Sequence, residues 1–369
     1  MRIKNLKLLN FRNYKQIEIN FQKANLLIGP NGSGKTSILE AIFLLSTAKS
    51  PRTSRNQDLV NWSRQESFLK LTLVDKDQGT KIIRLEISRQ KENGSKTFSL
   101  DGVVIEPKNI VGVFKAVYFS PETLQIVNGS PQDRRRFVDI LLSQISPHYL
   151  AELIEYRKIL INRNKLLKDI ALKRREREEI IFWDMKLVEF GSKIMRARKG
   201  AIADLAKPLK GYHQIISDAK KTKLKIIYHP SFAFDKNEDI ESAFTERIAS
   251  EIGFELKYGN TLYGPHRDDI RFFYEGRDAT SFCSRGEVRS IVVALKLAEA
   301  DYIQKETGEA PVILLDDIFS ELDEKRSSSL ANLILNNYQS IITSTEKEII
   351  KTVIKQKIKT IKLKGAVYV

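Results

Sequence analysis

The chain has 369 residues, of which 62 are Lys or Arg and 46 are Asp or Glu, so its formal net charge is +16. A hydrophobic content of 42% and a charged content of 29% are ordinary for a globular protein and exclude wholesale disorder. The single cysteine, Cys283, excludes a disulfide scaffold and a zinc cluster built on thiolates, and it fits a reducing compartment.

The positive charge is unevenly distributed along the chain. Residues 1–150 carry a net charge of +10, residues 151–225 carry +10, residues 226–344 carry −9 and residues 345–369 carry +5. A lysine-rich surface that only favours solubility accounts for the tail. The concentrated charge in residues 151–225 favours nucleic acid as the partner.

The first residues carry charges every few positions and lack the apolar stretch of a signal peptide. Apolar runs such as residues 312–315 are too short to span a bilayer. We therefore expect a cytoplasmic protein without a membrane partner.

The N-terminal part of the chain alternates between strand-like and helical patterns. Alternating apolar and polar residues predict half-buried strands over residues 3–9 and 16–21, joined by a turn at Asn13 and Tyr14. A short apolar run predicts a buried strand over residues 25–28, and the spacing that follows predicts a helix over residues 36–48. Further strands are predicted over residues 68–74, 82–87, 97–100 and 111–118.

Residues 149–197 contain no proline, and their apolar side chains recur at helical spacing. Arg163, Arg174 and Arg177 break the apolar seam, so we expect two antiparallel helices that turn near this basic run. We expect Lys207 and Pro208 to close the helical unit.

The C-terminal part predicts strands over residues 223–228 and 253–258, then a helix over 288–306, a buried strand over 312–315, a helix over 324–335 and a strand over 340–344. Alternation of lysines with apolar residues predicts terminal strands with one wet face over residues 351–364. Helices between apolar strands predict an α/β fold with a parallel core.

A phosphate-binding loop follows the third predicted strand. Gly29, Pro30, Asn31, Gly32, Ser33, Gly34, Lys35 and Thr36 match the pattern G-x-x-x-x-G-K-[ST]. Such a loop curls its backbone N–H groups around phosphate oxygens at a helix N-terminus, and glycine permits the required backbone angles. We expect Lys35 to reach the β- and γ-phosphates and Thr36 to help hold Mg²⁺.

Two carboxylates, Asp316 and Asp317, end the apolar strand predicted over residues 312–315. In P-loop proteins a strand that ends in Asp beside the phosphate loop completes the Mg²⁺ shell. We assign Asp316 to Mg²⁺ through water and Asp317 to the polarisation of the attacking water. Because adjacent side chains on a strand point to opposite faces, both roles require that the strand has ended.

A second anion site is indicated where Ser284 and Gly286 precede the helix predicted from residue 288. A serine hydroxyl, backbone N–H groups and the helix dipole together favour an anion there. Two more carboxylates, Glu321 and Asp323, lie in the loop after Asp317.

In this order the motifs resemble those of ABC/SMC-type ATPases. Residues 11–14 (FRNY), 121–139 (PETLQIVNGSPQDRRRFVD), 263–269 (YGPHRDD) and the run from Asp316 to Asp323 resemble the diagnostic blocks of the RecF family. The resemblance implies an α/β fold, namely an ABC/SMC-type P-loop ATPase head with an inserted helical lobe and no long coiled coil. The expected divisions are an N-terminal part of the ATPase lobe over residues 1–118, a helical insertion over 119–225 and a C-terminal ATPase core over 226–369.

The resemblance also implies a function. It implies a slow, DNA-stimulated ATPase that uses ATP and Mg²⁺ and forms an ATP-dependent homodimer, in which Ser284 and Gly286 of one subunit meet the nucleotide on the other. It further implies binding to duplex DNA and gapped junctions without sequence specificity, and cooperation with RecR and RecO in loading RecA on single-strand gaps. Roles in the SOS response and in replication restart are implied as well.

The sequence departs from the family pattern at two places. Glu287 stands where the signature often has Gln, and its negative charge would repel a γ-phosphate unless it pointed away. Thr343, Ser344 and Thr345 stand where many ABC proteins carry a histidine, so a hydroxyl is expected near the γ-phosphate.

The motifs are also compatible with two other functions. One is a transport-type ABC ATPase subunit, and the other is a DNA-binding scaffold whose dimer is held together by a nucleotide without hydrolysis. The basic helical insertion and the missing histidine argue against the transport subunit.

Other candidate residues keep open alternatives. Arg12 and Asn13 could reach the nucleotide or form an ordinary hairpin turn. Arg134, Arg135 and Arg136 could clamp phosphate or face the acidic stretch of the chain, and His266 and Arg267 could serve a lobe interface or a structural turn. The expected DNA contacts are Lys173, Arg174, Arg175 and Arg177.

Overall fold

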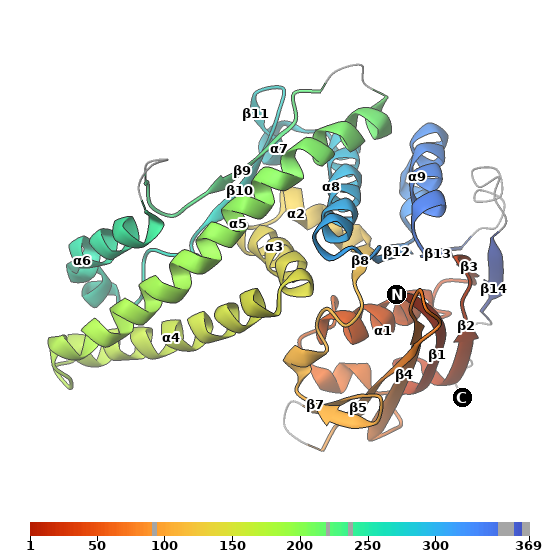
Figure 1. The fold of residues 1–369 in the computed structure, drawn as a ribbon, viewed down its shortest axis with the longest axis horizontal. Coiled ribbons are helices and arrows are strands. Elements are labelled where there is room, and N and C mark those ends of the chain that lie inside the picture. The colour runs from red at the N-terminus through yellow and green to blue at the C-terminus, as the bar shows by residue number, and fades with distance from the viewer. Residues whose placement is uncertain (91–93, 219–221, 235–238, 346–357, 364–369) are drawn as a thin grey trace. The chain divides into compact units, whose positions relative to one another are not determined.

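The computed structural model describes residues 1–90, 94–218, 222–234, 239–345 and 358–363. The chain divides into two compact units, whose elements are labelled in Figure 1. Unit 1 consists of Met1–Leu124, Gly211–Lys221 and Arg285–Val369, and unit 2 consists of Gln125–Lys210 and Thr222–Ser284.

The first sheet of unit 1 is antiparallel and six-stranded, in the order β2-β1-β4-β5-β6-β7. Its strands are β1 (Arg2–Phe11), β2 (Tyr14–Asn20), β4 (Glu66–Val74), β5 (Thr80–Ser88), β6 (Ser95–Leu100) and β7 (Val103–Ile105). Their alternating sequences place one set of apolar side chains, including Leu6, Leu71 and Leu85, in the core. The strands predicted in this part of the chain over residues 3–9, 16–21, 68–74, 82–87 and 97–100 are confirmed.

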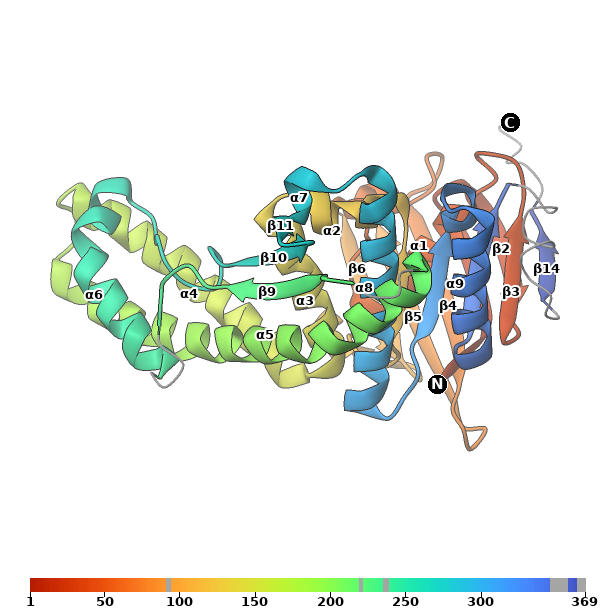
Figure 2. The same cartoon turned by 90° about the horizontal axis from the view of Figure 1, so that it is seen from above.

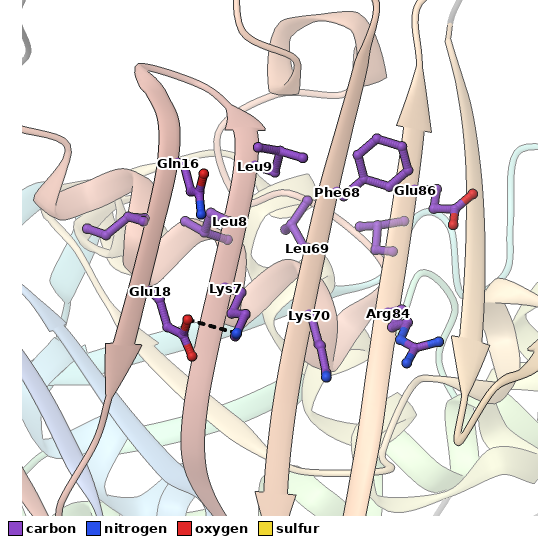
Figure 3. Close-up of a pocket in the computed structure, with 12 residues that line it drawn as sticks. Lys7, Leu8, Leu9, Gln16, Glu18, Phe68, Leu69, Lys70, Arg84 and Glu86 are labelled. Atoms are coloured by element: carbon purple, nitrogen blue, oxygen red, sulfur yellow. Dashed lines mark ion pairs between the residues drawn. The ribbon is translucent and has the colours of Figure 1, made fainter.

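The other face of this sheet carries a shallow pocket (Figure 3). Leu9 lies opposite Phe68 and Lys7 lies opposite Lys70 across the strand pair β1–β4. Lys7 also forms an ion pair of 2.8 Å with Glu18. None of the predicted nucleotide-binding residues lines this pocket, so it is distinct from the phosphate loop.

The second sheet of unit 1 is parallel and has the order β14-β3-β13-β12-β8. Its strands are β3 (Ala24–Ile28), β8 (Ala116–Phe119), β12 (Val312–Asp316), β13 (Ser340–Ser344) and β14 (Lys359–Lys362). Helices α1 (Lys35–Thr47), α8 (Arg285–Thr307) and α9 (Glu324–Asn337) belong to the same unit. Strands β12 and β13 are buried along their whole length, as expected where both faces of a parallel sheet are covered.

The parallel core was predicted from the sequence, and the α/β class is confirmed. Strand β14 falls within the predicted tail strands, whereas residues 351–357 lie outside the described residues. The strand predicted over residues 111–118 was too long, since β8 begins only at Ala116 and turns precede it.

Unit 2 is mainly helical. Its long helices are α3 (Pro131–Ile145), α4 (Pro147–Ala171), the greater part of α5 (Ile180–Ser217) and α6 (Ile240–Tyr258), and Figure 2 shows α4 and α5 joined by a short turn. The smaller elements are α2 (Gln125–Asn128), α7 (Ala279–Phe282) and a sheet of β9 (Lys225–His229), β10 (Asp269–Tyr274) and β11 (Arg277–Asp278). The predicted helical pair with a turn at the basic run is confirmed.

Two predicted elements were wrong. Pro208 does not end the predicted helix, because α5 continues through it to Ser217. Leu205 and Leu209, on either side of the proline, are buried. Residues 253–258 are not a strand but the end of α6, whose buried Phe244, Ile248 and Glu255 recur at helical spacing.

The division of the chain also differs from the expected one. Residues 226–284 were expected in the ATPase core but lie in unit 2. The physical reason is that this segment is tied to the long helices, since Asp269 of β10 forms an ion pair with Arg134 of α3 and Glu255 of α6 forms one with Arg163 of α4. Among the helices of the described residues, none has the length and apolar character needed to cross a membrane.

Candidate nucleotide-binding site

The phosphate loop joins the end of β3 to the start of α1, as predicted. Gly32 and Gly34 have φ angles of +79° and +92°, in the left-handed region that favours glycine. A Cβ atom on Gly34 would lie 2.6 Å from the ring of Tyr14. Position 34 therefore requires glycine both for its backbone angles and for the close approach of the tyrosine.

Lys35 turns its ammonium group into this loop. The side chain is buried, and its Nζ donates hydrogen bonds to the carbonyl oxygens of Gly29 at 2.6 Å and Pro30 at 3.1 Å. Burial lowers the pKa of Lys35, and the negative charges of Asp317 and Asp316 oppose that shift. The ammonium group thus lies within the loop, where phosphate oxygens would need a positive charge.

Asp316 ends β12 and meets Thr36, although 280 residues separate them in the chain. Its Oδ1 accepts hydrogen bonds from Thr36 Oγ1 at 3.0 Å and from Thr343 Oγ1 at 2.9 Å, and its Oδ2 accepts one from the Tyr118 hydroxyl at 3.1 Å. Burial raises the pKa of Asp316, and the hydrogen bonds from Thr343, Thr36 and Tyr118 act against that rise. The two residues predicted to hold Mg²⁺ therefore lie within hydrogen-bonding distance of each other.

Asp317 lies beyond the end of the strand. Its φ of +53° turns the chain out of the extended conformation, and its backbone N–H donates to Thr343 Oγ1 at 2.9 Å. The strand has therefore ended between the two carboxylates, which was the condition for both to serve one site. The Thr343 hydroxyl thus bridges the backbone of Asp317 and the carboxylate of Asp316, and it does not face solvent as a free group.

Three buried polar atoms around the loop have no hydrogen-bond partner among the described residues: Asn13 Oδ1, Ser33 Oγ and Asp317 Oδ1. Buried polar atoms in proteins are normally satisfied, so such a group of atoms fits a ligand that brings its own donors and acceptors. Oxygen atoms of carboxylates and hydroxyls are also the ligands that Mg²⁺ prefers. The residues present therefore fit a nucleotide with Mg²⁺.

The turn before the phosphate loop supports it from one side. Asn13 Nδ2 donates to the Gly32 carbonyl at 3.3 Å, and the Tyr14 hydroxyl donates to the Ser33 carbonyl at 2.8 Å. Arg12 instead binds Glu40 of α1 through Nε at 2.9 Å and Nη2 at 2.6 Å. Tyr14 was missed in the sequence as a site residue; its place in the FRNY block beside Asn13 was the available signal.

Ser284 and Gly286, the residues of the predicted second anion site, lie at the start of α8. Ser284 is exposed and directly precedes α8, whose first residue is Arg285. A Cβ atom on Gly286 would have the Arg326 guanidinium at 3.6 Å as its one neighbour within 4 Å. The predicted helix start at these residues is therefore present, and its role as an anion site stays a prediction.

The predicted DNA contacts, Lys173, Arg174, Arg175 and Arg177, are all exposed and lie between α4 and α5. Arg175 forms an exposed ion pair of 3.2 Å with Glu179. By contrast, Arg134 binds Asp269 at 2.7 Å and Arg135 donates to the Asp268 carbonyl at 2.5 Å. Arg134 and Arg135 therefore contact the acidic stretch of the chain, which was one of the two alternatives predicted for them.

His266 has a structural place within unit 2. Its Nδ1 lies 2.7 Å from the Tyr156 hydroxyl and its Nε2 lies 3.1 Å from the Thr261 carbonyl, which fits a neutral ring that donates from Nε2. Burial lowers the pKa of His266 to about 4, although the Thr261 hydrogen bond opposes the shift.

This depressed pKa predicts a loss of stability in acid. Between the ordinary pKa near 6.5 and the value near 4, the unfolded chain binds the proton and the folded chain does not, so stability falls with falling pH by at most about 3 kcal/mol. We expect His266→Gln to flatten the difference in unfolding free energy between pH 7 and pH 4.5, measured by urea denaturation. The exposed His148→Gln is the control, and an unaltered pH dependence in His266→Gln would contradict the assignment.

Comparisons with known proteins agree with this geometry. A family model described as the RecF/RecN/SMC N terminal domain matches residues 2–367. The chain is 34% identical over 347 residues to the DNA replication and repair protein RecF of Lachnoclostridium phytofermentans, covering 94% of this chain and 93% of the relative. It is 38% identical over 350 residues to the protein of the same name from Bacillus cereus (strain AH820), covering 94% and 92%.

Solved structures give the same result. The recombination mediator protein RecF with ATPrS, in the RecFOR pathway, superposes with a TM-score of 0.87 at 33% identity over 98% of this chain and 96% of that one. Its ATP complex gives a TM-score of 0.86 at 33% identity, over 94% and 92%. An SMC head bound to a winged-helix domain of ScpA, at 18% identity and a TM-score of 0.56, shares the fold. The fold expected from the motif order is confirmed, and the chain belongs to the RecF family of ABC/SMC-type ATPases.

Proposed function

We propose that this chain is a Mg²⁺-dependent ATPase that closes as an ATP-dependent homodimer on DNA during the repair of single-strand gaps. The observation that supports the proposal most strongly is the hydrogen bond of 3.0 Å between Thr36, the residue after the loop lysine, and Asp316 at the end of β12. The similarity to RecF solved with ATP supports ATP as the nucleotide.

The residues of the site divide the work of phosphoryl transfer to water. Lys35 stabilises the negative charge on the β- and γ-phosphates, and the N–H groups of the loop hold their oxygens. Thr36 and Asp316 would hold Mg²⁺, which neutralises charge between the β- and γ-phosphates when bound. Asp317, placed by its backbone hydrogen bond to Thr343, orients the attacking water.

The second subunit completes the site in this proposal. Ser284 and Gly286 at the start of α8 contact the γ-phosphate held by the partner, so ATP joins two copies and hydrolysis releases them. A slow, DNA-stimulated hydrolysis would act as a timer of the closed dimer. The similarity to proteins of the RecFOR pathway supports RecR and RecO as partners. The proposal also includes RecA loading, the SOS response and replication restart, with the cytoplasm as the location.

The curated relatives are DNA replication and repair proteins, which favours this function over a transport subunit. The exposed basic turn of Lys173, Arg174, Arg175 and Arg177 is the proposed contact with DNA phosphates. Contacts with phosphate carry no sequence information, which fits binding to duplex and gapped junctions alike.

DNA binding with and without ATP, at several salt concentrations, tests the proposal. We expect ATP to tighten binding. Each phosphate contact contributes about 0.9 to the slope of log affinity against log salt, so neutralising all four basic residues with glutamine should lower the slope by about 2 to 4.

A control variant neutralises four other exposed cations of unit 2, Lys158, Arg196, Lys207 and Lys210, and so changes the net charge equally. An equal drop in slope in both variants would show a general charge effect. An unchanged slope in the first variant would place the DNA elsewhere, and binding indifferent to ATP would contradict the ATP-gated clamp itself.

A further inference from the structure

Tyr118 lies beside the proposed metal site but is not part of any motif that led to it. It belongs to β8, which pairs in parallel with β12, and it is in register with Leu314, two residues before Asp316. The side chain is 5% exposed, and its ring packs on Phe43 of α1 with centroids 5.4 Å apart. Burial and the packing on Phe43 hold the ring, so its hydroxyl has a fixed direction.

That hydroxyl reaches the carboxylate of Asp316. The two oxygens of Asp316 are held differently: Oδ1 accepts from Thr36 and Thr343, whereas Oδ2 accepts from Tyr118 at 3.1 Å. Among the hydrogen bonds of the described residues, Tyr118 is the one donor to Oδ2. Because rotation about the last side-chain bond of aspartate is soft, a donor on each oxygen is what fixes the plane of the carboxylate.

We propose that Tyr118 is a positioning residue for the divalent cation that accompanies the nucleotide. By holding Oδ2, its hydroxyl keeps Oδ1 turned toward Thr36, the other oxygen proposed to hold the cation. The inference rests on the proposed function, since it takes Asp316 and Thr36 as the residues that hold Mg²⁺.

The chemistry of a buried phenol supports this role. A hydroxyl removed from water costs free energy unless it is hydrogen-bonded, and a phenylalanine would fill the same space against Phe43 without that cost. The hydroxyl therefore does something that packing does not require. Groups that orient metal-binding side chains typically change metal affinity by about 10 to 100-fold when they are removed.

The test is Tyr118→Phe, which removes one oxygen atom. A fluorescent ATP analogue is titrated into the full chain in saturating Mg²⁺ and again in EDTA. The dissociation constant in EDTA divided by that in Mg²⁺ is the ratio that measures the coupling between metal and nucleotide. We expect the variant to reduce this ratio about tenfold, with nucleotide affinity in EDTA unchanged. An electron paramagnetic resonance titration with Mn²⁺ in the presence of the analogue should show the same weakening.

Three further variants make the result decisive. Tyr338→Phe is the matched control, because it also removes a tyrosine hydroxyl bonded to a carboxylate of unit 1, that of Asp301 at 2.7 Å. Tyr118→Leu removes the ring as well. Asp316→Asn weakens the proposed metal ligand directly.

The outcomes separate the inference from the proposed function. A wild-type ratio in Tyr118→Phe, together with a reduced ratio in Tyr118→Leu and Asp316→Asn, would overturn the inference and leave Tyr118 a packing residue. An equal loss of affinity with and without Mg²⁺ would also overturn it, since the loop rather than the cation would be disturbed. A wild-type ratio in Asp316→Asn would overturn the proposed metal site and the inference with it.

Discussion

The Ser284→Arg variant is expected to bind ATP normally as a monomer and to lose ATP-dependent dimerisation. Ser284 is exposed and directly precedes α8, and it belongs to unit 2, whereas Lys35 and Asp316 belong to unit 1. A substitution there leaves the subunit's own phosphate loop intact. In the proposed dimer it places a large side chain where the partner's γ-phosphate would meet a small hydroxyl.

Sedimentation velocity with ATP measures this loss directly, and a fluorescent nucleotide measures binding to the monomer. Ser250→Arg is the control, because it adds the same side chain at an exposed position of α6 in unit 2. If Ser284→Arg sedimented as a dimer with ATP, the shared nucleotide site would be refuted, whereas loss of dimers in both variants would show an effect of added charge alone.

The second large effect is on stability. We expect Arg163→Leu to lower the free energy of unfolding by about 3 to 5 kcal/mol. Arg163 and Glu255 both have fully buried side chains and form an ion pair of 2.6 Å, while Arg163 Nε binds Asp184 at 2.7 Å. Removing the cation leaves the carboxylate of Glu255 without its opposite charge in the core of unit 2.

Urea denaturation of the full chain measures this loss. Lys158→Leu on the same helix breaks an exposed ion pair with Glu155 and should change stability by less than about 1 kcal/mol. The double variant Arg163→Leu with Glu255→Leu should recover part of the loss, because no unpaired charge then remains buried. A small effect of Arg163→Leu, comparable to that of Lys158→Leu, would contradict the importance of the buried pair.

The parts of the site that were predictable are those encoded in short, contiguous patterns. The phosphate loop is local, since the strand, the glycines and the helix start lie within a few residues of each other. The meeting of Thr36 with Asp316 was predicted from the pattern of P-loop proteins, in which a buried strand that ends in Asp lies beside the phosphate loop. The sequence indicated that Asp317 can join Asp316 in one site only if the strand ends between them. The φ of +53° at Asp317 shows that the strand does end there.

The parts that were missed depend on neighbours distant in the sequence. Tyr118 reads as one more apolar strand residue, and its contact with Asp316 spans 198 positions. Arg163 interrupts an apolar pattern in the sequence, but its partner could not be predicted. That partner, Glu255, belongs to a segment whose residues alternate as in a strand. Residues 226–284 were expected in the ATPase core but belong to unit 2, because ion pairs with Arg134 and Arg163 decide their place and composition does not reveal such pairs.

The order of strands in the parallel sheet has a consequence for the chain as it is synthesised. Every pairing in that sheet involves β12, β13 or β14, while β3 and β8 do not pair with each other. Strand β8 therefore has no partner until β12, from residue 312, has been synthesised, and β3 has none until β13, from residue 340; all of unit 2 has been made by then. Such distant pairings are slow to form, so the phosphate loop and Asp316 come together among the last events of folding. A nascent or C-terminally shortened chain thus has the loop but no nucleotide site.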